Sequence, residues 1–278
     1  MNPYIEIIRP GNAVMAIVTT LLMAIITGTY NISLLLVAVS IFLAVGGGNT
    51  INDYFDYKID MINQPQRPIP SGRVSRVNAR NYALILFVLA SVIGFYIGIL
   101  PGLIVSLSSL LMIFYAYSLK KIALVGNIAI SGLTFLCFAY AGIVISPDVG
   151  VPFVLSCYLG FYAFLMTLSR EIVKDIQDME GDREEGARTL PIVAGKRVSS
   201  IVAAIVMILD CIVSPIVVFN GLLPGILYLP IMLIAVLIFI YCTISILRNT
   251  ESENCGKVSK LIKIGMFIAF IAFIAGSI

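Results

Sequence analysis

Residues 46–60 read Gly46-Gly-Gly-Asn-Thr-Ile-Asn-Asp-Tyr-Phe-Asp-Tyr-Lys-Ile-Asp60. The stretch ends an apolar run and carries amide and carboxylate side chains that fall within roughly 100° of a helix circumference: Asn49, Asn52, Asp53, Asp56 and Asp60. Carboxylates on one face repel each other at a membrane boundary, so we expect a cation between them. With no histidine in the chain, all the nearby donors are oxygens, which favours a hard cation such as Mg²⁺ completed by substrate phosphates.

A second acidic stretch repeats this pattern further along the chain. Its members on one helical face are Glu171, Asp175, Asp178 and Asp182, whereas Glu180 points away. The last three follow Asp53, Asp56 and Asp60 at a constant spacing of 122 positions. We therefore predict one polytopic domain over residues 1–278, with pseudo-repeats at about 1–121 and 122–247 and a last helix at about 259–277. The two carboxylate faces can then meet across one cavity.

The composition predicts an all-α membrane protein. The chain has 278 residues, of which 60% are hydrophobic and 12% charged. Apolar runs long enough to cross a bilayer predict nine transmembrane helices, at about residues 11–28, 31–51, 82–100, 102–119, 122–145, 151–173, 198–219, 222–247 and 259–277. The five cysteines form no C-x-x-C pair, and without histidine both haem ligation by histidine and imidazole catalysis are excluded.

The charges lie on one side of the expected topology. The 18 Lys and Arg residues precede the first run or lie around the polar segments after the second, fourth, sixth and eighth runs. The positive-inside rule places these segments in the cytoplasm, so we expect a multi-pass protein of the cell membrane whose active site faces the cytoplasm. Asp210 is an isolated carboxylate inside an apolar run, which argues against a transporter with a midplane ion site.

Cationic and aromatic residues beside the acidic stretches predict anion binding. Arg67 lies in a loop constrained by prolines at positions 65, 68 and 70, where a fixed guanidinium suits a diphosphate. Tyr117 and Lys121 are four residues apart, so on a helix they would share a face and reach one phosphate together. Two Mg²⁺-binding clusters beside a diphosphate would allow an allylic C–O bond to break towards a carbocation, with an isoprenyl tail in the apolar bundle.

Three motifs resemble those of the UbiA-type intramembrane prenyltransferases: Asn49-x-x-Asn-Asp-x-x-Asp-x-x-x-Asp60, Asp175-x-x-Asp-x-x-x-Asp182 and Tyr117-x-x-x-Lys121. The resemblance spans the chain and implies nine helices around a central cavity with a cytoplasmic cap. It also implies Mg²⁺-dependent transfer of a prenyl group from a prenyl diphosphate to an acceptor. By position, one metal–diphosphate half-site would use Asn49, Asn52, Asp53, Asp56 and Asp60. The other would use Asp175, Asp178 and Asp182, with Arg67, Lys121 and Lys174 on the phosphates.

The acceptor is either a lipid or an aromatic compound. The segment from Asn52 to Ser75 is similar to that of archaeal family members that transfer geranylgeranyl to the hydroxyl of geranylgeranylglyceryl phosphate in ether-lipid synthesis. A dianionic glycerol phosphate needs more cations than an aromatic acid, and Arg9 and Lys120 are candidates, with Asn12 to hydrogen-bond the glycerol or phosphate. Prenylation of hydroxybenzoate or dihydroxynaphthoate for quinone synthesis is the alternative. We expect contact with membrane lipids and no nucleic-acid partner; the oligomeric state stays open.

A membrane phosphotransferase acting on CDP-alcohols also uses Asp clusters. Its D-G-x-x-A-R run is absent here, because Tyr57 follows Asp56.

Overall fold

The computed structural model describes residues 2–184, 186–224 and 226–277, except the side chains of residues 12 and 15. The regular structure within these ranges is helical, and the β-type pairing there is a single isolated bridge between Ile122 and Arg188. The helices of the first half are α1 (Pro3–Ile7), α2 (Pro10–Thr27), α3 (Ile32–Phe55), α4 (Tyr57–Asn63), α5 (Arg76–Ile97), α6 (Ile99–Tyr117) and the 3₁₀ helix η1 (Leu119–Lys121).

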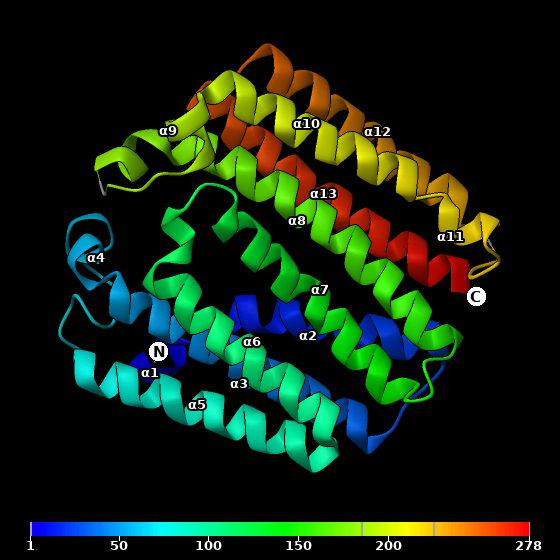
Figure 1. Cartoon of the computed structure of the whole chain (residues 1–278), viewed down its shortest axis with the longest axis horizontal. Coiled ribbons are helices and arrows are strands. Elements are labelled where there is room, and N and C mark those ends of the chain that lie inside the picture. The colour runs from blue at the N-terminus through cyan, green and yellow to red at the C-terminus, as the bar shows by residue number, and fades with distance from the viewer. Residues whose placement is uncertain (1, 185, 225, 278) are drawn as a thin grey trace.

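The second half continues the same alternation of long and short helices. It contains α7 (Val125–Ile145), α8 (Val151–Glu184), α9 (Leu190–Ala194), α10 (Lys196–Val213), α11 (Ile216–Phe219), α12 (Tyr228–Arg248) and α13 (Ser252–Ser277). The long helices α2, α3, α5 and α6 gather on one side of α7, and α8, α10, α12 and α13 gather on the other (Figure 1). Because α7 packs against members of both groups, it joins the two sides of the bundle.

Eight helices in the described part of the chain are long and apolar enough to cross a membrane. They confirm the prediction of an all-α membrane fold. The first predicted span, 11–28, corresponds to α2, which contributes a shorter apolar helix over Ala16–Thr27. Nine crossing helices and a cytoplasmic cap therefore stay predictions, as does the division into pseudo-repeats.

The two acidic stretches fold differently, although their sequences have the same spacing. The helix expected to end near residue 173 continues as α8 through Glu184, so its carboxylates lie on one continuous helix. In the first stretch α3 ends at Phe55, and Asp56 sits between α3 and α4 with φ −80° and ψ 3°. The expectation of one uninterrupted helical face from Asn49 to Asp60 is wrong, because the chain turns at Asp56 and places Asp60 on a separate short helix.

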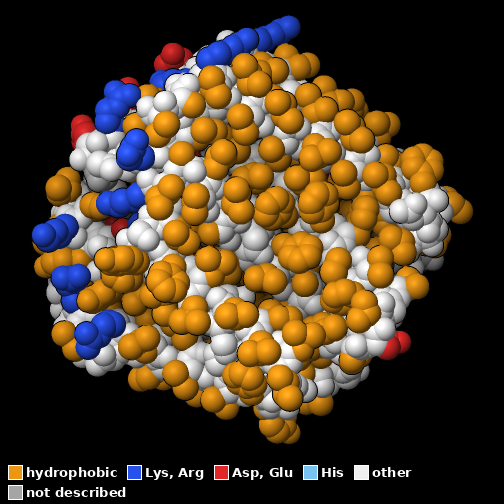
Figure 2. Space-filling model, viewed as in Figure 1, with side chains coloured by type: hydrophobic (Ala, Val, Ile, Leu, Met, Phe, Trp, Pro, Cys, Tyr) orange, Lys and Arg blue, Asp and Glu red, His pale blue; other side chains and the backbone are white. Residues whose placement is uncertain are grey.

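The charged side chains gather at one end of the molecule. In Figure 2, which has the view of Figure 1, Lys and Arg lie along the left and upper left edge, near the position of α4 and α9, and apolar side chains cover most of the remaining face. Apolar side chains face lipid at no desolvation cost, whereas charged groups are stable where water is available. The one-sided distribution predicted from the sequence is thus a property of the folded surface.

Candidate active site

The first acidic stretch contributes a buried charge network. Asp53 at the end of α3 is 2% exposed and forms an ion pair with Arg9, while Nη1 of Arg67 lies 3.5 Å from the same carboxylate. Nη1 of Arg67 also donates to both oxygens of Asp60, each at 2.7 Å. This network joins the N-terminal segment, α3, α4 and the proline-rich loop. Neither Asp53 nor Asp60 lines the two cavities described below.

A second ion pair ties the proline-rich loop to α1 at the surface. Arg73 donates to both carboxylate oxygens of Glu6, at 2.6 and 2.8 Å. This hydrogen bonding lowers the pKa of the Glu6 carboxyl. Arg73 also donates to the backbone carbonyl of Gln66, so one side chain connects α1 with its own loop. The loop that carries Arg67 is therefore held from two directions.

Asp56 has a different environment from its neighbours Asp53 and Asp60. Its carboxylate accepts a hydrogen bond from the amide of Asn52 at 2.8 Å and forms an ion pair with Lys120 of η1. Lys120 Nζ also donates to the Asn52 amide oxygen at 3.1 Å. The three side chains form one polar group that lines both cavities through Asp56 and Lys120. The carboxylate of the first stretch that is open to a ligand is therefore the one at the helix break.

The second acidic stretch faces this group across a cavity of about 220 Å³. The residues of α8 that line it are Glu171, Lys174, Asp175, Asp178 and Asp182. On the opposite side lie Asp56, Lys120 and Lys121, with Tyr115 of α6. The structure thus brings together one carboxylate of the first stretch and the whole predicted face of the second. The amide of Asn127 on α7 donates to Asp175 at 2.9 Å and fixes the orientation of that carboxylate.

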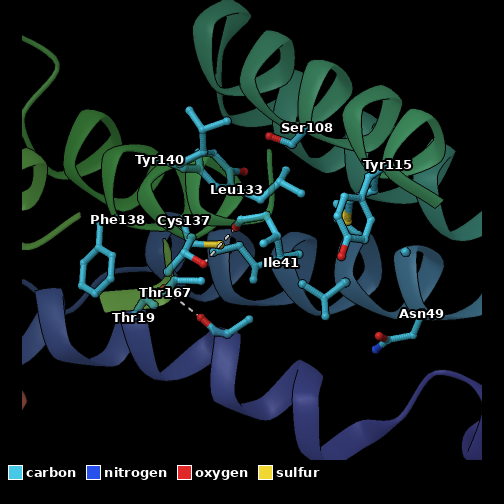
Figure 3. A pocket seen from close by; sticks show the side chains of 18 of the residues that line it. Thr19, Ile41, Asn49, Ser108, Tyr115, Leu133, Cys137, Phe138, Tyr140 and Thr167 are labelled. Carbon is cyan, nitrogen blue, oxygen red and sulfur yellow. Dashed lines mark hydrogen bonds between the residues drawn. The ribbon is translucent and has the colours of Figure 1, made fainter. Parts of the chain in front are cut away.

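A larger cavity of about 670 Å³ opens beside the acidic one. The two share the lining residues Asp56, Tyr115, Lys120, Glu171 and Lys174. Asn49 and Tyr115 lie at one end of the larger cavity in Figure 3, and Phe138 lies at the other. Its walls are mostly apolar, and the hydroxyls of Ser40 and Tyr140 hydrogen-bond to each other at 2.9 Å. A ligand with a charged head and an apolar tail fits this arrangement.

Tyr117 does not lie where the sequence predicted. The helix α6 ends at Tyr117, and Lys121 belongs to η1, so the two residues do not share the face of one helix. Tyr117 is 66% exposed and its ring contacts Phe55, whereas Lys121 lines the acidic cavity. Tyr115 takes the inward position instead. The side chain of Asn12, another predicted site residue, lies outside the described residues.

Asn127 and Tyr115 carried no sequence signal that singled them out. Asn127 lies in an apolar run, and its relation to Asp175 exists only once α7 and α8 pack together. Tyr115 is one of two tyrosines at the end of α6, and only the register of the helix shows which one faces inward. Asn49 donates to the backbone carbonyl of Ile8 at 2.9 Å and so also holds the N-terminal segment.

The side chains around the acidic cavity suit a hard cation. Their donors are carboxylate and amide oxygens, which Mg²⁺ prefers. Among the described residues, no group of three acidic, histidine or cysteine side chains is close enough to hold a metal ion by itself. A cation here would need ligands from a phosphate or from water, which is how Mg²⁺ binds at most phosphate sites. The donor set fits Mg²⁺ bound together with a phosphorylated ligand.

The apolar helices thus enclose a polar cavity, lined by one carboxylate of the first acidic stretch and by the acidic face of the second, beside a mostly apolar cavity. This arrangement suits an enzyme of the membrane that acts on phosphorylated lipids. Residues 13–271 match the UbiA prenyltransferase family, and the chain belongs to that family. The family resemblance predicted from the three motifs is therefore confirmed.

Several relatives show which members of this family the chain is similar to. A protein of Methanothermobacter thermautotrophicus named digeranylgeranylglyceryl phosphate synthase is 55% identical over 277 residues, covering 100% of this chain and 96% of the relative. A Pyrococcus furiosus protein of the same name is 39% identical, covering 99% of this chain and 97% of the relative. A solved structure of a digeranylgeranylglyceryl phosphate synthase aligns with a TM-score of 0.86 and 35% identity over 99% of this chain and 97% of that one.

The fold is also shared with a UbiA homologue of Archaeoglobus fulgidus bound to dimethylallyl diphosphate and Mg²⁺. That structure aligns with a TM-score of 0.65 and 16% identity, covering 97% of this chain and 98% of that chain. At 16% identity, this similarity shows a shared fold and nothing further.

Proposed function

We propose that the chain transfers a geranylgeranyl group from geranylgeranyl diphosphate to the hydroxyl of geranylgeranylglyceryl phosphate, in a Mg²⁺-dependent reaction. The observation that carries the proposal is the 55% identity over the whole chain to a protein named for this product. The geometry agrees with it, since a charged cavity adjoins an apolar one that can take a prenyl tail. Prenylation of an aromatic acid is the competing outcome of the test below.

The polar groups of the acidic cavity serve the diphosphate in this proposal. Asp56 and Asn52 on one side and Asp175, Asp178 and Asp182 on the other would hold Mg²⁺. When bound, the metal neutralises the diphosphate and makes it a better leaving group. Lys120, Lys121 and Lys174 bind phosphate oxygens and orient the diphosphate towards the apolar cavity. Tyr115 lies where the two cavities join and shields the reacting carbon from water.

Asp53 and Asp60 have a positioning role in this proposal. Their carboxylates are buried, line neither cavity and pair with Arg9 and Arg67. Keeping the pairs closed fixes the loop and the N-terminal segment next to the cavity. Arg67 then supports phosphate binding by holding this loop in place. Asn49 supports it by holding the N-terminal segment through its hydrogen bond to the Ile8 carbonyl. The active site faces the cytoplasm, where both substrates carry their phosphate groups.

A panel of acceptors tests the proposal. Purified protein in detergent receives geranylgeranyl diphosphate and Mg²⁺ with geranylgeranylglyceryl phosphate, hydroxybenzoate or dihydroxynaphthoate, each also with excess EDTA. We expect turnover of the glycerol phosphate lipid, loss of that turnover in EDTA, and no prenylated aromatic product. Faster turnover of either aromatic acid would replace the lipid assignment, and full activity in EDTA would remove the metal from the mechanism.

A further inference from the structure

Several cations beside the cavities are already neutralised by partners from the first acidic stretch. Arg9 pairs with Asp53, Arg67 with Asp60, and Lys120 with Asp56. A second set of cations lies where α8 packs against α13 and carries less compensating negative charge. It consists of Arg170 of α8 and Lys263 of α13.

This second set carries more positive than negative charge. Arg170 of α8 forms an ion pair with Glu171, while its Nε atom is buried and has no hydrogen-bond partner among the described residues. Gly256 of α13 packs against Gln177 of α8, and seven residues further along this antiparallel pair of helices the same faces bring Lys263 beside Arg170 (Figure 1). Arg170 and Lys263 together with Glu171 leave a net charge of +1 where α8 packs against α13. Like charges this close destabilise the free protein unless an anion joins them.

The position of Lys263 on α13 connects the cluster to the apolar cavity. Met266 and Phe270 of the same helix line that cavity. Residues three and seven positions apart share a helical face, so Lys263 lies on the same face of α13 as these two residues, about 10 Å along the axis from Phe270 and just outside the lining of the cavity. Thr167, Glu171 and Lys174 line the same cavity from α8. An anion held between Arg170 and Lys263 therefore lies between two helices that both contribute residues to the apolar cavity.

We propose that Arg170 and Lys263 bind the phosphate of the acceptor lipid; this proposal rests on the function proposed above. A glycerol phosphate monoester carries close to two negative charges at neutral pH, so the surplus positive charge of the cluster attracts it. Arg170 Nε gains the acceptor that it lacks, and Lys263 supplies a flexible ammonium at the rim. The prenyl tail of the acceptor then runs along Met266 and Phe270. The diphosphate of the donor stays in the acidic cavity, between Asp56 and the carboxylates of α8.

Steady-state kinetics with both substrates tests this assignment through Lys263→Gln. Lys263 is exposed, so the variant is expected to fold. The KM for geranylgeranylglyceryl phosphate should rise roughly tenfold, the loss expected for one charge-assisted contact, and the KM for geranylgeranyl diphosphate should change by less than about twofold. Lys263→Arg should restore the KM for the lipid. Lys257→Gln is the matched control, because this lysine of the same helix pairs with Glu253 at 2.6 Å.

A binding measurement separates this site from the catalytic one. A dialkylglycerol phosphate with saturated tails is titrated without Mg²⁺ or donor, with and without added anionic phospholipid. We expect weaker binding to Lys263→Gln and to Arg170→Gln than to the unchanged protein, at either phospholipid content. Competition by the phospholipid that abolishes the difference would assign the cluster to general membrane anchoring and overturn the proposal. An equal rise in both KM values, or no rise in either, would overturn it as well.

The two proposals can fail separately. If the unchanged protein does not prenylate the lipid but binds the dialkylglycerol phosphate in a manner that depends on Lys263, the anion site stands and the reaction assignment fails. If the lipid is prenylated and the Lys263→Gln protein behaves like the Lys257→Gln control, the reaction stands and the anion site fails.

Discussion

Asp60 is 4% exposed, and both oxygens of its carboxylate accept hydrogen bonds from the guanidinium of Arg67. Arg67→Ala would leave this buried charge, and part of the charge of Asp53, without compensation. We expect a loss of folding free energy on the order of 3 kcal/mol, seen as a lower apparent melting temperature in detergent. The double variant Arg67→Ala with Asp60→Asn should recover part of the loss, because a neutral amide tolerates burial better than an unpaired carboxylate.

Arg73→Ala is the control for this prediction, because it removes an exposed ion pair instead of a buried one. Arg73 makes an equally well-aligned pair with Glu6, but its side chain is 40% exposed and water can solvate both partners. Exposed pairs contribute little, so the melting temperature should barely change. Equal destabilisation by Arg67→Ala and Arg73→Ala would show that burial of Asp60 does not set the cost.

Asn127 is the residue whose role only the structure reveals, because its amide donates to Asp175. Asn127→Ala removes this donor and frees the carboxylate to rotate, so the Mg²⁺ concentration for half-maximal activity should rise by about tenfold. The measurement is a Mg²⁺ titration at saturating substrates. Ser131→Ala is the control on the same helix, since the Ser131 hydroxyl donates to the backbone carbonyl of Asn127 and not to Asp175. An unchanged Mg²⁺ requirement in the Asn127→Ala protein would remove Asn127 from the site.

At the scale of elements, η1 and α7 meet so closely that only glycine fits at position 126. A Cβ atom there would lie 2.8 Å from the Cα of Lys120 and 2.9 Å from the carbonyl oxygen of Leu119, and both are backbone atoms that cannot rotate away. Gly126→Ala must therefore displace η1, which carries Lys120 to Asp56. We expect kcat to fall by one to two orders of magnitude, roughly the cost of misplacing a catalytic group by about 1 Å.

Gly132→Ala provides the control on the same helix, because a Cβ atom at that position meets nothing within 4 Å. Its activity should stay close to that of the unchanged protein. Normal activity of Gly126→Ala, with a melting temperature like that of Gly132→Ala, would contradict the role given to η1.

The sequence predicted the second acidic element well and the first one only in part. On α8 the spacing of Asp175, Asp178 and Asp182 was sufficient, because a long helix without interruption keeps its periodicity. Periodicity carried no sign that the chain would turn at Asp56. That turn comes with long-range partners: Lys120 from η1 holds Asp56, and Arg67 holds Asp60. Local spacing cannot report such contacts, which explains why Tyr117 was predicted to lie in the site and Tyr115 was not.

At the scale of the whole molecule, hydropathy and charge predicted more of the architecture than any sequence motif did. The apolar runs gave the long helices, and the placement of Lys and Arg gave the charged end of the bundle (Figures 1 and 2). These properties need no tertiary contact, because each helix meets the membrane independently. The cavities between the two groups of helices depend on packing and could not be predicted in detail.

The orientation of the charged end towards the cytoplasm is the remaining prediction at this scale. Single cysteines are introduced into a protein from which the native residues Cys137, Cys157, Cys211, Cys242 and Cys255 have been removed, and intact cells or oriented vesicles are labelled with an impermeant maleimide. Ser71→Cys and Ala194→Cys lie in exposed positions at the charged end, and Asp148→Cys and Asn220→Cys lie in exposed turns beyond the ends of α7 and α11. We expect the first pair to react only from the cytoplasmic side and the second pair only from outside, because moving the Lys- and Arg-rich end across the membrane is unfavourable. Detergent permeabilisation, which should make all four cysteines reactive, is the control for accessibility. Labelling of Ser71→Cys and Asp148→Cys from the same side would contradict the proposed topology and the assignment of the active site to the cytoplasmic side.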